Sequence, residues 1–496
     1  MFVRTIQECR PPGFDTPTAP CYDKAMSGKH VLLVAPYIHD FAAYDLWLKP
    51  LGLLYVAAAA EAAGYSVRIL NCLDRRHPAV TSSPGPSRAR NHPHGTGKFS
   101  WEPIPKPPPL AMIPRRYKRY GIPLEAFRNG LADGPPPDAI GVSSMMTYWC
   151  DGVGETISLA REAWPGVPVI LGGVYASLCP DHAREHAGAD YLVTGPGEEG
   201  FVEILRSIIG KGAGPRADSD RLAGSSSPRE ARFGMTSVPA YHLLDNLDSV
   251  SMLTSFGCPF ACAYCASKLL RNGFIQRPVK DVVEEIEYYV NDRKIRDIAL
   301  YDDALLVKPD DHIKPILREV IAEGLQACFH APNGLHANMI DEELAHLMKE
   351  TGFATVRLSI ESIDAARLKD SCAKVTPDGF KRAVSCLLAA GFEIGDLQAY
   401  LLMGVPGQQE SEVKETMLFA HEMNTLVRLS DFSPIPGTGY FRAATETYGL
   451  DLSEPLLQNS SVYPYLVPGL ADRYKRLKEL ARSLNTELLR HTENVL

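Results

Sequence analysis

Three cysteines lie close together in the segment SFGCPFACAYCAS (255–267). They are Cys258, Cys262 and Cys265, with the spacing C-x3-C-x2-C. A structural zinc site takes four ligands, commonly as two C-x2-C pairs, and no second pair lies nearby in the sequence. A cubane iron–sulfur cluster also prefers four thiolates, so a loop that offers three leaves one iron open to another ligand. The spacing therefore favours a cluster that takes part in a reaction.

Polar and glycine residues follow the predicted strands of the same region. Six strands are predicted in SVSMLTS, RDIALY, QACFHA, ATVRLSI, DLQAYLL and LVRLSDF, separated by helical patterns such as VKDVVEEIEYYVNDR. Six such units indicate a partial (β/α) barrel, in which chemistry gathers at the C-terminal ends of the strands. The residues that follow the second to fifth strands are Asp302, Asp303, His330, Asn333, Glu361, Ser362, Gly404, Pro406 and Gly407.

The residues before this region also alternate between strands and helices. HVLLVAP, YSVRILN, DAIGVSS, VPVILGG and ADYLVTG are expected to be buried strands. Five such strands predict a parallel, doubly wound, Rossmann-like sheet whose ligand lies at their carboxyl ends. GPGEEG (195–200) matches a dinucleotide fingerprint, but it follows the last strand and places Glu198 and Glu199 where a pyrophosphate would bind. A dinucleotide site is therefore not expected.

Four segments organise the chain. The first domain is expected at 1–209, with an insertion at 74–136 whose prolines, as in PIPKPPPL, exclude regular structure, although AMIPRRYKRYGIPLEAF is expected to fold over the sheet. The polar stretch at 210–231 is the expected linker, and the partial barrel follows at 232–440. The segment 441–496 contains an amphipathic helix, LADRYKRLKELARSLNTELLRH, that either closes the barrel or forms a subunit contact.

Composition excludes several classes of protein. A chain of 496 residues that is 45% apolar and 22% charged can bury the cores of two or three globular domains. The formal net charge of -8 disfavours a long nucleic-acid groove. The N-terminus lacks an apolar signal segment, and Glu61 interrupts the most apolar helix, so a cytoplasmic protein is expected. In that compartment the 11 cysteines are not expected to form disulfides.

The cysteine loop, which follows the first of six strands and has Tyr264 before its third cysteine, resembles that of the radical S-adenosylmethionine (SAM) superfamily. The resemblance implies a [4Fe–4S] cluster whose open iron is chelated by SAM, and cleavage of SAM to a 5′-deoxyadenosyl radical. ALYDDALL takes the place of the motif that holds the SAM amino group, with Asp302 and Asp303 where many members have Gly-Gly-Glu. Which of these two carboxylates contacts SAM is left open.

Three further segments resemble motifs of the same superfamily in the same order. RLSIES resembles the ribose motif and implicates Ser359 and Glu361, with Arg357 near enough to meet a carboxylate. LLMGVPGQ resembles the segment that passes the adenine and implicates Gly404, and FSPIPGTGY resembles the end of the sixth strand. The resemblance names no residue for the catalytic step itself.

The first domain resembles the cobalamin-binding domains of the B12-dependent radical SAM class through KPLGLLYVAAAAEAAGY, GVSS, LGGVYAS and TGPGEEG. The resemblance implies two groups of cobalamin-binding residues, one along the cleft for the lower nucleotide and one beside the corrin ring. They are Ser143, Ser144, Gly172 and Gly173, and then Gly195, Gly197 and Glu198. YIHDFA keeps His39 of the D-x-H-x-x-G motif but has no Asp to orient it, so a surface or capping role is expected rather than a bond to cobalt.

These resemblances imply a cobalamin-dependent radical SAM enzyme that uses a [4Fe–4S] cluster, SAM and cobalamin. It is expected to methylate an unactivated carbon of a small-molecule or cofactor substrate, with a reductant such as flavodoxin or ferredoxin as partner. The alternatives are a non-methylating rearrangement or cyclisation, a cofactor sensor without turnover, and RNA modification of the methylthiotransferase type. The last would bring an extra cysteine-rich domain and a basic RNA-binding module, and neither is visible in the sequence.

Overall fold

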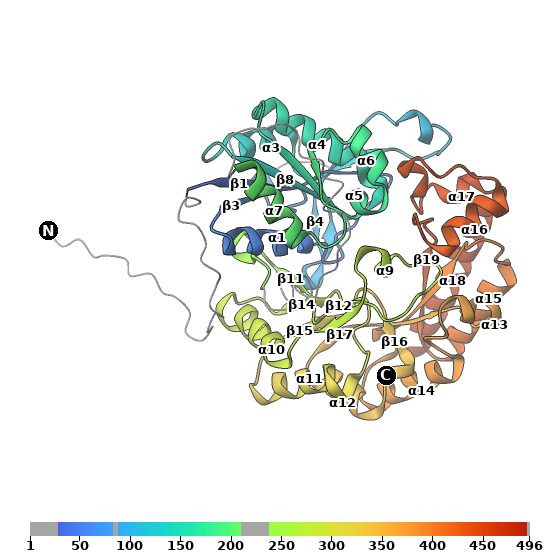
Figure 1. The fold of residues 1–496 in the computed structure, drawn as a ribbon. Coiled ribbons are helices and arrows are strands. Elements are labelled where there is room, and N and C mark those ends of the chain that lie inside the picture. The colour runs from blue at the N-terminus through green and yellow to red at the C-terminus, as the bar shows by residue number, and fades with distance from the viewer. Residues whose placement is uncertain (1–27, 83–87, 210–237, 494–496) are drawn as a thin grey trace.

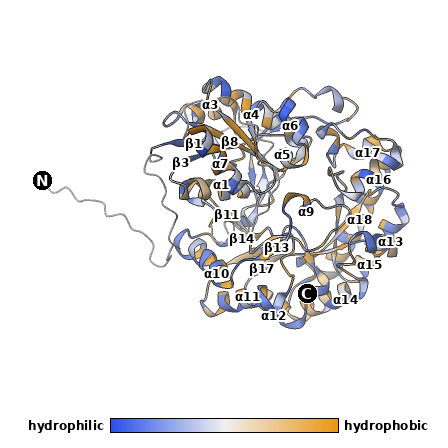
Figure 2. Ribbon diagram, in the orientation of Figure 1, coloured by the Kyte–Doolittle hydropathy of each residue, from blue (hydrophilic) through white to orange (hydrophobic). Residues whose placement is uncertain are grey.

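The structure is a computed structural model that describes residues 28–82, 88–209 and 238–493 (Figure 1). The predicted linker at 210–231 lies outside these ranges. In the described residues, no helix is both long enough and apolar enough to cross a membrane. Apolar residues gather on the strands of both large sheets and on the inward faces of the helices (Figure 2).

The first sheet has five parallel strands, as the sequence predicts. Their spatial order is β10 (Tyr191–Leu192), β9 (Val169–Gly173), β8 (Ala139–Ser144), β1 (His30–Ala35) and β3 (Ser66–Asn71). Helices α1 (Leu51–Ala62) and α7 (Gly197–Ile209) pack on Val31 and Leu33 of one face. Helices α3 (Leu124–Ala132) and α4 (Cys150–Ala163) pack on Leu32 and Val34 of the other. Because β1 is apolar on both faces, it can occupy an interior position in a doubly wound sheet, between β8 and β3.

The proline-rich insertion is more regular than predicted. It contains α2 (Pro78–Thr81), β4 (Arg90–Asn91), β5 (Gly97–Lys98), β6 (Trp101–Pro103), β7 (Lys118–Tyr120) and α3. Strands β6 and β7 extend β2 (Ile38–Asp40) into a small antiparallel sheet. The prediction that prolines exclude regular structure here is wrong, because Pro103 ends an edge strand and Pro78 opens a helix. Neither position needs a backbone N–H.

The second large sheet contains the six predicted strands, all parallel. Their order is β11 (Ser249–Met252), β14 (Asp297–Leu300), β15 (Cys328–His330), β17 (Phe353–Glu361), β18 (Leu397–Met403) and β19 (Leu426–Asp431). The helices that surround it in Figure 1 are α10 (Val279–Glu287), α11 (Ile313–Ala322), α12 (Glu342–Glu350), α14 (Pro377–Ala389) and α15 (Glu410–Glu422). Alternate strand residues such as Ile298, Phe329 and Leu358 join the apolar core with these helices. The residues between them point to the inner face of the partial barrel.

The C-terminal helix α18 (Leu470–Glu493) lies along the edge strand β19. The Asn485 side chain accepts a hydrogen bond from the Val427 N–H at 2.7 Å and donates one to the Val427 carbonyl at 2.9 Å. The Tyr474 hydroxyl donates to the carbonyl of Met403 at 3.0 Å. Of the two predicted roles for this helix, the structure shows closure of the sheet edge.

Candidate active site

The cysteine loop lies between two short antiparallel strands that follow β11, namely β12 (Ser255–Gly257) and β13 (Phe274–Gln276). Gly257 has φ +75°, and a Cβ at this position would lie 2.2 Å from the carbonyl oxygen of Gly273. Only glycine fits this close approach. The loop therefore leaves the C-terminal end of the first strand of the barrel, as the sequence predicts.

Asp302 anchors the start of this loop. Its carboxylate accepts hydrogen bonds from the N–H and hydroxyl groups of Thr254 and Ser255, the shortest at 2.6 Å, and its side chain is buried. Asp303, the next residue, is exposed and lines the cavity described below. The two carboxylates that the sequence left as alternatives therefore have different surroundings. The Asp302 carboxylate is engaged by the start of the loop, whereas that of Asp303 lines the cavity beside Ser267.

The three cysteines differ in exposure. Cys258 and Cys262 are buried, whereas Cys265 is exposed. Burial raises the pKa of both buried thiols, that of Cys262 to about 11 although Lys374 acts in the opposite direction. At neutral pH these sulfurs become thiolates only when a metal takes the place of the proton. Three soft donors on one loop, one of them open to solvent, fit a cluster with one iron free of protein ligands.

Lys374 lies beside the loop, although no sequence motif marks it. Its Nζ is 3.3 Å from Oε1 of Glu361 and 5.4 Å from the ring centre of Tyr264. Glu361 ends β17 with φ +61°, a strained conformation for a residue other than glycine. The hydroxyl of Tyr264 is buried, and none of the described residues is its hydrogen-bond partner. Two of the predicted SAM-binding residues, Tyr264 and Glu361, are thus brought together with a cation that sequence reasoning missed.

The other predicted SAM-binding residues lie along the barrel strands. Ser359 is buried in β17, and Arg357 on the same strand face lies 5.5 Å from the ring centre of Tyr400. The Nε atom of Arg357 is buried without a partner among the described residues, as expected of a group that awaits a ligand. Gly404 follows β18 with φ +86°, and a Cβ there would lie 1.9 Å from the Tyr474 hydroxyl. The packing of α18 therefore already requires glycine at this position.

A cavity separates the two large sheets. Its lining contains all the predicted cobalamin-binding residues except Ser144, together with Phe256, Gly257, Tyr301 and Asp303 of the barrel. Ser144 is buried instead, and its hydroxyl accepts a hydrogen bond from the N–H of Tyr175 at 3.1 Å. Residues at the C-terminal ends of β8 and β9, and residues that follow β10, thus face residues that follow β11 and β14. The C-terminal strand ends of both domains open into one space.

An ion pair joins the two domains at this cavity. Oε1 of Glu198 lies 3.2 Å from Nη2 of Arg271, and the Arg271 guanidinium is 4.8 Å from the ring centre of Phe256. Arg271 lies in the cysteine-loop segment and was not predicted from the sequence. It meets Glu198 only because the two domains pack together. The open turn at Gly195 and Gly197 is one of the places where the two domains approach each other.

His39 lies away from this cavity. Its Nε2 atom is 2.8 Å from Oε2 of Glu155, and the two side chains line a second cavity together with Asp151 and His182. None of the residues described as lining the cavity between the domains is a histidine. His39 is thus a buried partner of Glu155, rather than the surface or capping residue expected from the sequence.

Comparisons with known proteins agree with this architecture. The family model of the radical SAM superfamily matches residues 252–420, and that of the B12-binding domain matches residues 122–205. The chain is 27% identical over 320 residues to an uncharacterised methyltransferase of Pyrococcus horikoshii. The match covers 61% of this chain and 68% of that protein. It is 23% identical over 498 residues to the cytidylyl-2-hydroxyethylphosphonate methyltransferase of Streptomyces wedmorensis, covering 88% of this chain and 85% of that enzyme.

A solved structure shares the fold across both domains. TsrM of Kitasatospora setae, a radical SAM methyltransferase determined with cobalamin and a [4Fe–4S] cluster bound, superposes with a TM-score of 0.60 at 19% identity. The match covers 85% of this chain and 78% of TsrM. The two family models and the order of their matches lead to one conclusion: the chain joins a B12-binding domain to a radical SAM domain, which is the combination that its resemblance to the cobalamin-dependent radical SAM enzymes implies.

Proposed function

We propose that this protein is a methyltransferase that transfers a methyl group to an unactivated carbon of a small-molecule substrate. The observation that carries the proposal is the single cavity onto which the C-terminal strand ends of both domains open. When bound, the cluster with SAM supplies a carbon radical and cobalamin supplies a methyl group. A substrate in this cavity is within reach of both domains, and the curated relatives named above are methyltransferases.

The residues of the barrel hold and orient the first pair of cofactors in this proposal. Cys258, Cys262 and Cys265 bind three irons of the cluster, and Asp302 fixes the loop that carries them. Asp303 is assigned to the SAM amino group, because its carboxylate is free of the contacts that engage Asp302. Lys374 places a positive charge beside Cys262 and Glu361, where it offsets negative charge on the bound thiolates.

The residues of the first domain bind cobalamin and exclude water. Ser143, Gly172 and Gly173 lie at the strand ends, and the turn from Gly195 to Glu198 approaches the barrel. The Glu198–Arg271 ion pair holds this turn against the cysteine-loop segment. Small residues at the strand ends leave room for a bulky ring system, and larger side chains would fill that space.

Two partners complete the proposal. The substrate is a small molecule, since the cavity lies between two domains and the formal net charge of -8 disfavours a nucleic acid. The electron that the cluster requires comes from a small redox protein such as flavodoxin or ferredoxin. The proposed compartment is the cytoplasm, where thiols stay reduced.

Cysteine variants combined with labelled SAM test the proposal. Reconstituted enzyme is incubated anaerobically with SAM labelled in its methyl group, a chemical reductant and protein-free cell extract, and labelled small molecules are sought. The expected product carries the label, and Cys258→Ala, Cys262→Ala and Cys265→Ala each abolish both the visible absorption of the cluster and labelling. Cys386→Ala, a partly exposed cysteine on α14, is the matched control and retains both. Cleavage of SAM with no labelled product would replace methyl transfer by the non-methylating alternative.

A further inference from the structure

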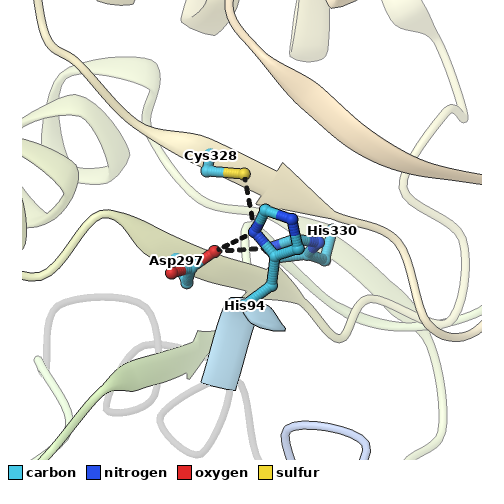
Figure 3. A group of neighbouring side chains, drawn as sticks. All are labelled: His94, Asp297, Cys328 and His330. Atoms are coloured by element: carbon cyan, nitrogen blue, oxygen red, sulfur yellow. Dashed lines mark hydrogen bonds and ion pairs between the residues drawn. The ribbon is translucent and has the colours of Figure 1, made fainter. Parts of the chain in front are cut away.

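Four potential metal ligands meet on the inner face of the barrel (Figure 3). They are His94, Asp297, Cys328 and His330, and their ligand atoms all lie within 4.8 Å of one another. Asp297 begins β14, whereas the cysteine loop and Asp302 lie at the opposite, C-terminal ends of the strands. The group is therefore separate from the residues that bind the iron–sulfur cluster.

The sheet geometry accounts for three of these ligands. Cys328 and His330 are two residues apart on β15, so their side chains point to the same face. Asp297 of β14 lies opposite Cys328 in the parallel register and shares this face. Phe329, between the two, points the other way into the apolar core. The fourth ligand, His94, comes from the insertion of the first domain, in the short helical turn η2 (Pro93–Gly95).

The distances suit a small tetrahedral ion. Oδ1 of Asp297 lies 2.9 Å from Nδ1 of His94 and 3.0 Å from Nε2 of His330. Sγ of Cys328 lies 3.6 Å from Nδ1 of His94. Bonds of about 2.0 to 2.3 Å around a tetrahedral ion place neighbouring ligand atoms about 3.3 to 3.8 Å apart. Small side-chain shifts therefore bring the four atoms onto one ion.

A second layer of contacts orients the histidines. Nδ1 of His330 lies 3.0 Å from the Thr355 hydroxyl, so that Nε2 points at the site, as is usual for metal-bound histidines. The Trp47 ring stacks on His330 with 4.2 Å between ring centres, and its Nε1 donates to the carbonyl of His94 at 2.5 Å. The His330 side chain is fully buried, whereas that of His94 is 50% exposed. The exposed side gives an ion a path into the site.

We propose that His94, Asp297, Cys328 and His330 bind one divalent transition-metal ion, with Zn²⁺ the best match, and that this ion fastens the insertion of the first domain to the barrel. Two imidazoles, a thiolate and a carboxylate form a donor set that Zn²⁺ accepts, whereas Mg²⁺ and Ca²⁺ take oxygen ligands. One ligand comes from the insertion and three come from the barrel, so the ion links segments about two hundred residues apart in sequence, such as His94 and Asp297 (203 apart). The inference does not depend on the reaction that the enzyme catalyses.

Metal titration of the full chain tests the binding. A background variant with Cys258, Cys262 and Cys265 all replaced by Ala removes the cluster site, and Co²⁺ then serves as the spectroscopic probe. We expect one Co²⁺ per chain with a thiolate-to-cobalt absorption band, loss of this band in Cys328→Ser, and at least about tenfold weaker binding in His94→Ala. Cys386→Ser is the matched control and keeps the band. His94 is exposed, so its replacement leaves the fold intact, as circular dichroism verifies.

Zinc analysis of the intact enzyme and proteolysis complete the test. Anaerobically purified wild-type protein is expected to contain about one zinc per chain in addition to iron, and His94→Ala to contain little. Zn²⁺ is expected to slow cleavage within the insertion in wild type and not in His94→Ala. Equal Co²⁺ binding by the background variant, and by the same variant carrying Cys328→Ser or His94→Ala, would overturn the site and leave a hydrogen-bonded cluster. Tight Zn²⁺ binding without a change in cleavage would overturn the fastening role.

Discussion

Glu198 and Arg271 form an ion pair across the boundary between the two domains, with 3.2 Å between Oε1 and Nη2. The side chains are only 12% and 23% exposed, so solvent screens this pair less than a surface pair. One partner lies on the turn assigned to cobalamin and the other lies in the segment that carries the cysteines. The pair thus connects the two cofactor-binding regions directly.

A double-mutant cycle measures this connection. Glu198→Gln, Arg271→Met and the double variant are each expected to bind cobalamin about fivefold more weakly than wild type, since the pair contributes about 1 kcal/mol. The double variant should be no worse than either single variant, because both remove the same interaction. Additive losses in the double variant would show that the two residues act independently.

Asp302 and Asp303 are expected to differ sharply when each is replaced by Asn. Asp302→Asn places an amide NH2 group where Thr254 and Ser255 donate hydrogen bonds to the carboxylate, so some of these bonds are lost. We expect the free energy of unfolding to fall by about 2 to 4 kcal/mol and the amount of bound iron to decrease. Asp303→Asn should keep iron and stability but weaken SAM binding about tenfold or more. Iron analysis, denaturant unfolding and equilibrium dialysis with SAM give the three readouts. If Asp302→Asn weakens SAM binding and keeps its iron, the assignment of the two residues is reversed.

Gly404→Ala tests whether packing or a cofactor requires glycine after β18. A Cβ would lie 1.9 Å from the Tyr474 hydroxyl, and φ is +86°, so we expect about 2 to 3 kcal/mol of destabilisation in denaturant unfolding. Gly395→Ala is the control in the same domain, because a Cβ there meets nothing closer than 4.0 Å. An unfolding free energy equal to wild type, combined with lost SAM binding, would contradict the packing explanation and favour a role for Gly404 at the adenine.

His39→Ala should leave the spin-resonance spectrum of Co(II) cobalamin in the enzyme unchanged. His39 is paired with Glu155 at 2.8 Å, and it lines a different cavity from the one assigned to cobalamin. Nitrogen hyperfine coupling from a histidine in the wild-type spectrum, lost in His39→Ala, would show that the imidazole binds cobalt.

The sequence predicted those features that depend on local patterns. Buried strands such as β1 and β8 are short runs of apolar and β-branched residues, and the helices between them are amphipathic or apolar, so both sheets were predicted almost strand for strand. The insertion was mispredicted because a proline count ignores position, and prolines at helix starts and on edge strands are harmless.

The missed site residues have no local signal. Lys374 meets Tyr264 of the cysteine loop, and Arg271 meets Glu198, only after distant segments pack together. The same holds for His94, which reaches Asp297 and Cys328 from another domain. His330 was predicted at the C-terminal rim among residues near the chemistry, but its side chain faces the group formed with His94, below that rim. Residue spacing in a strand predicts a face, and only the fold determines which residues share it.

Product stoichiometry tests the central claim most directly. With its true substrate, SAM and a reductant, the anaerobic enzyme should form S-adenosylhomocysteine, 5′-deoxyadenosine and methylated product in equal amounts. This follows because one SAM restores the methyl group and another is cleaved for each transfer in the proposed reaction. Formation of 5′-deoxyadenosine without S-adenosylhomocysteine, with a product that gains no methyl mass, would contradict methyl transfer.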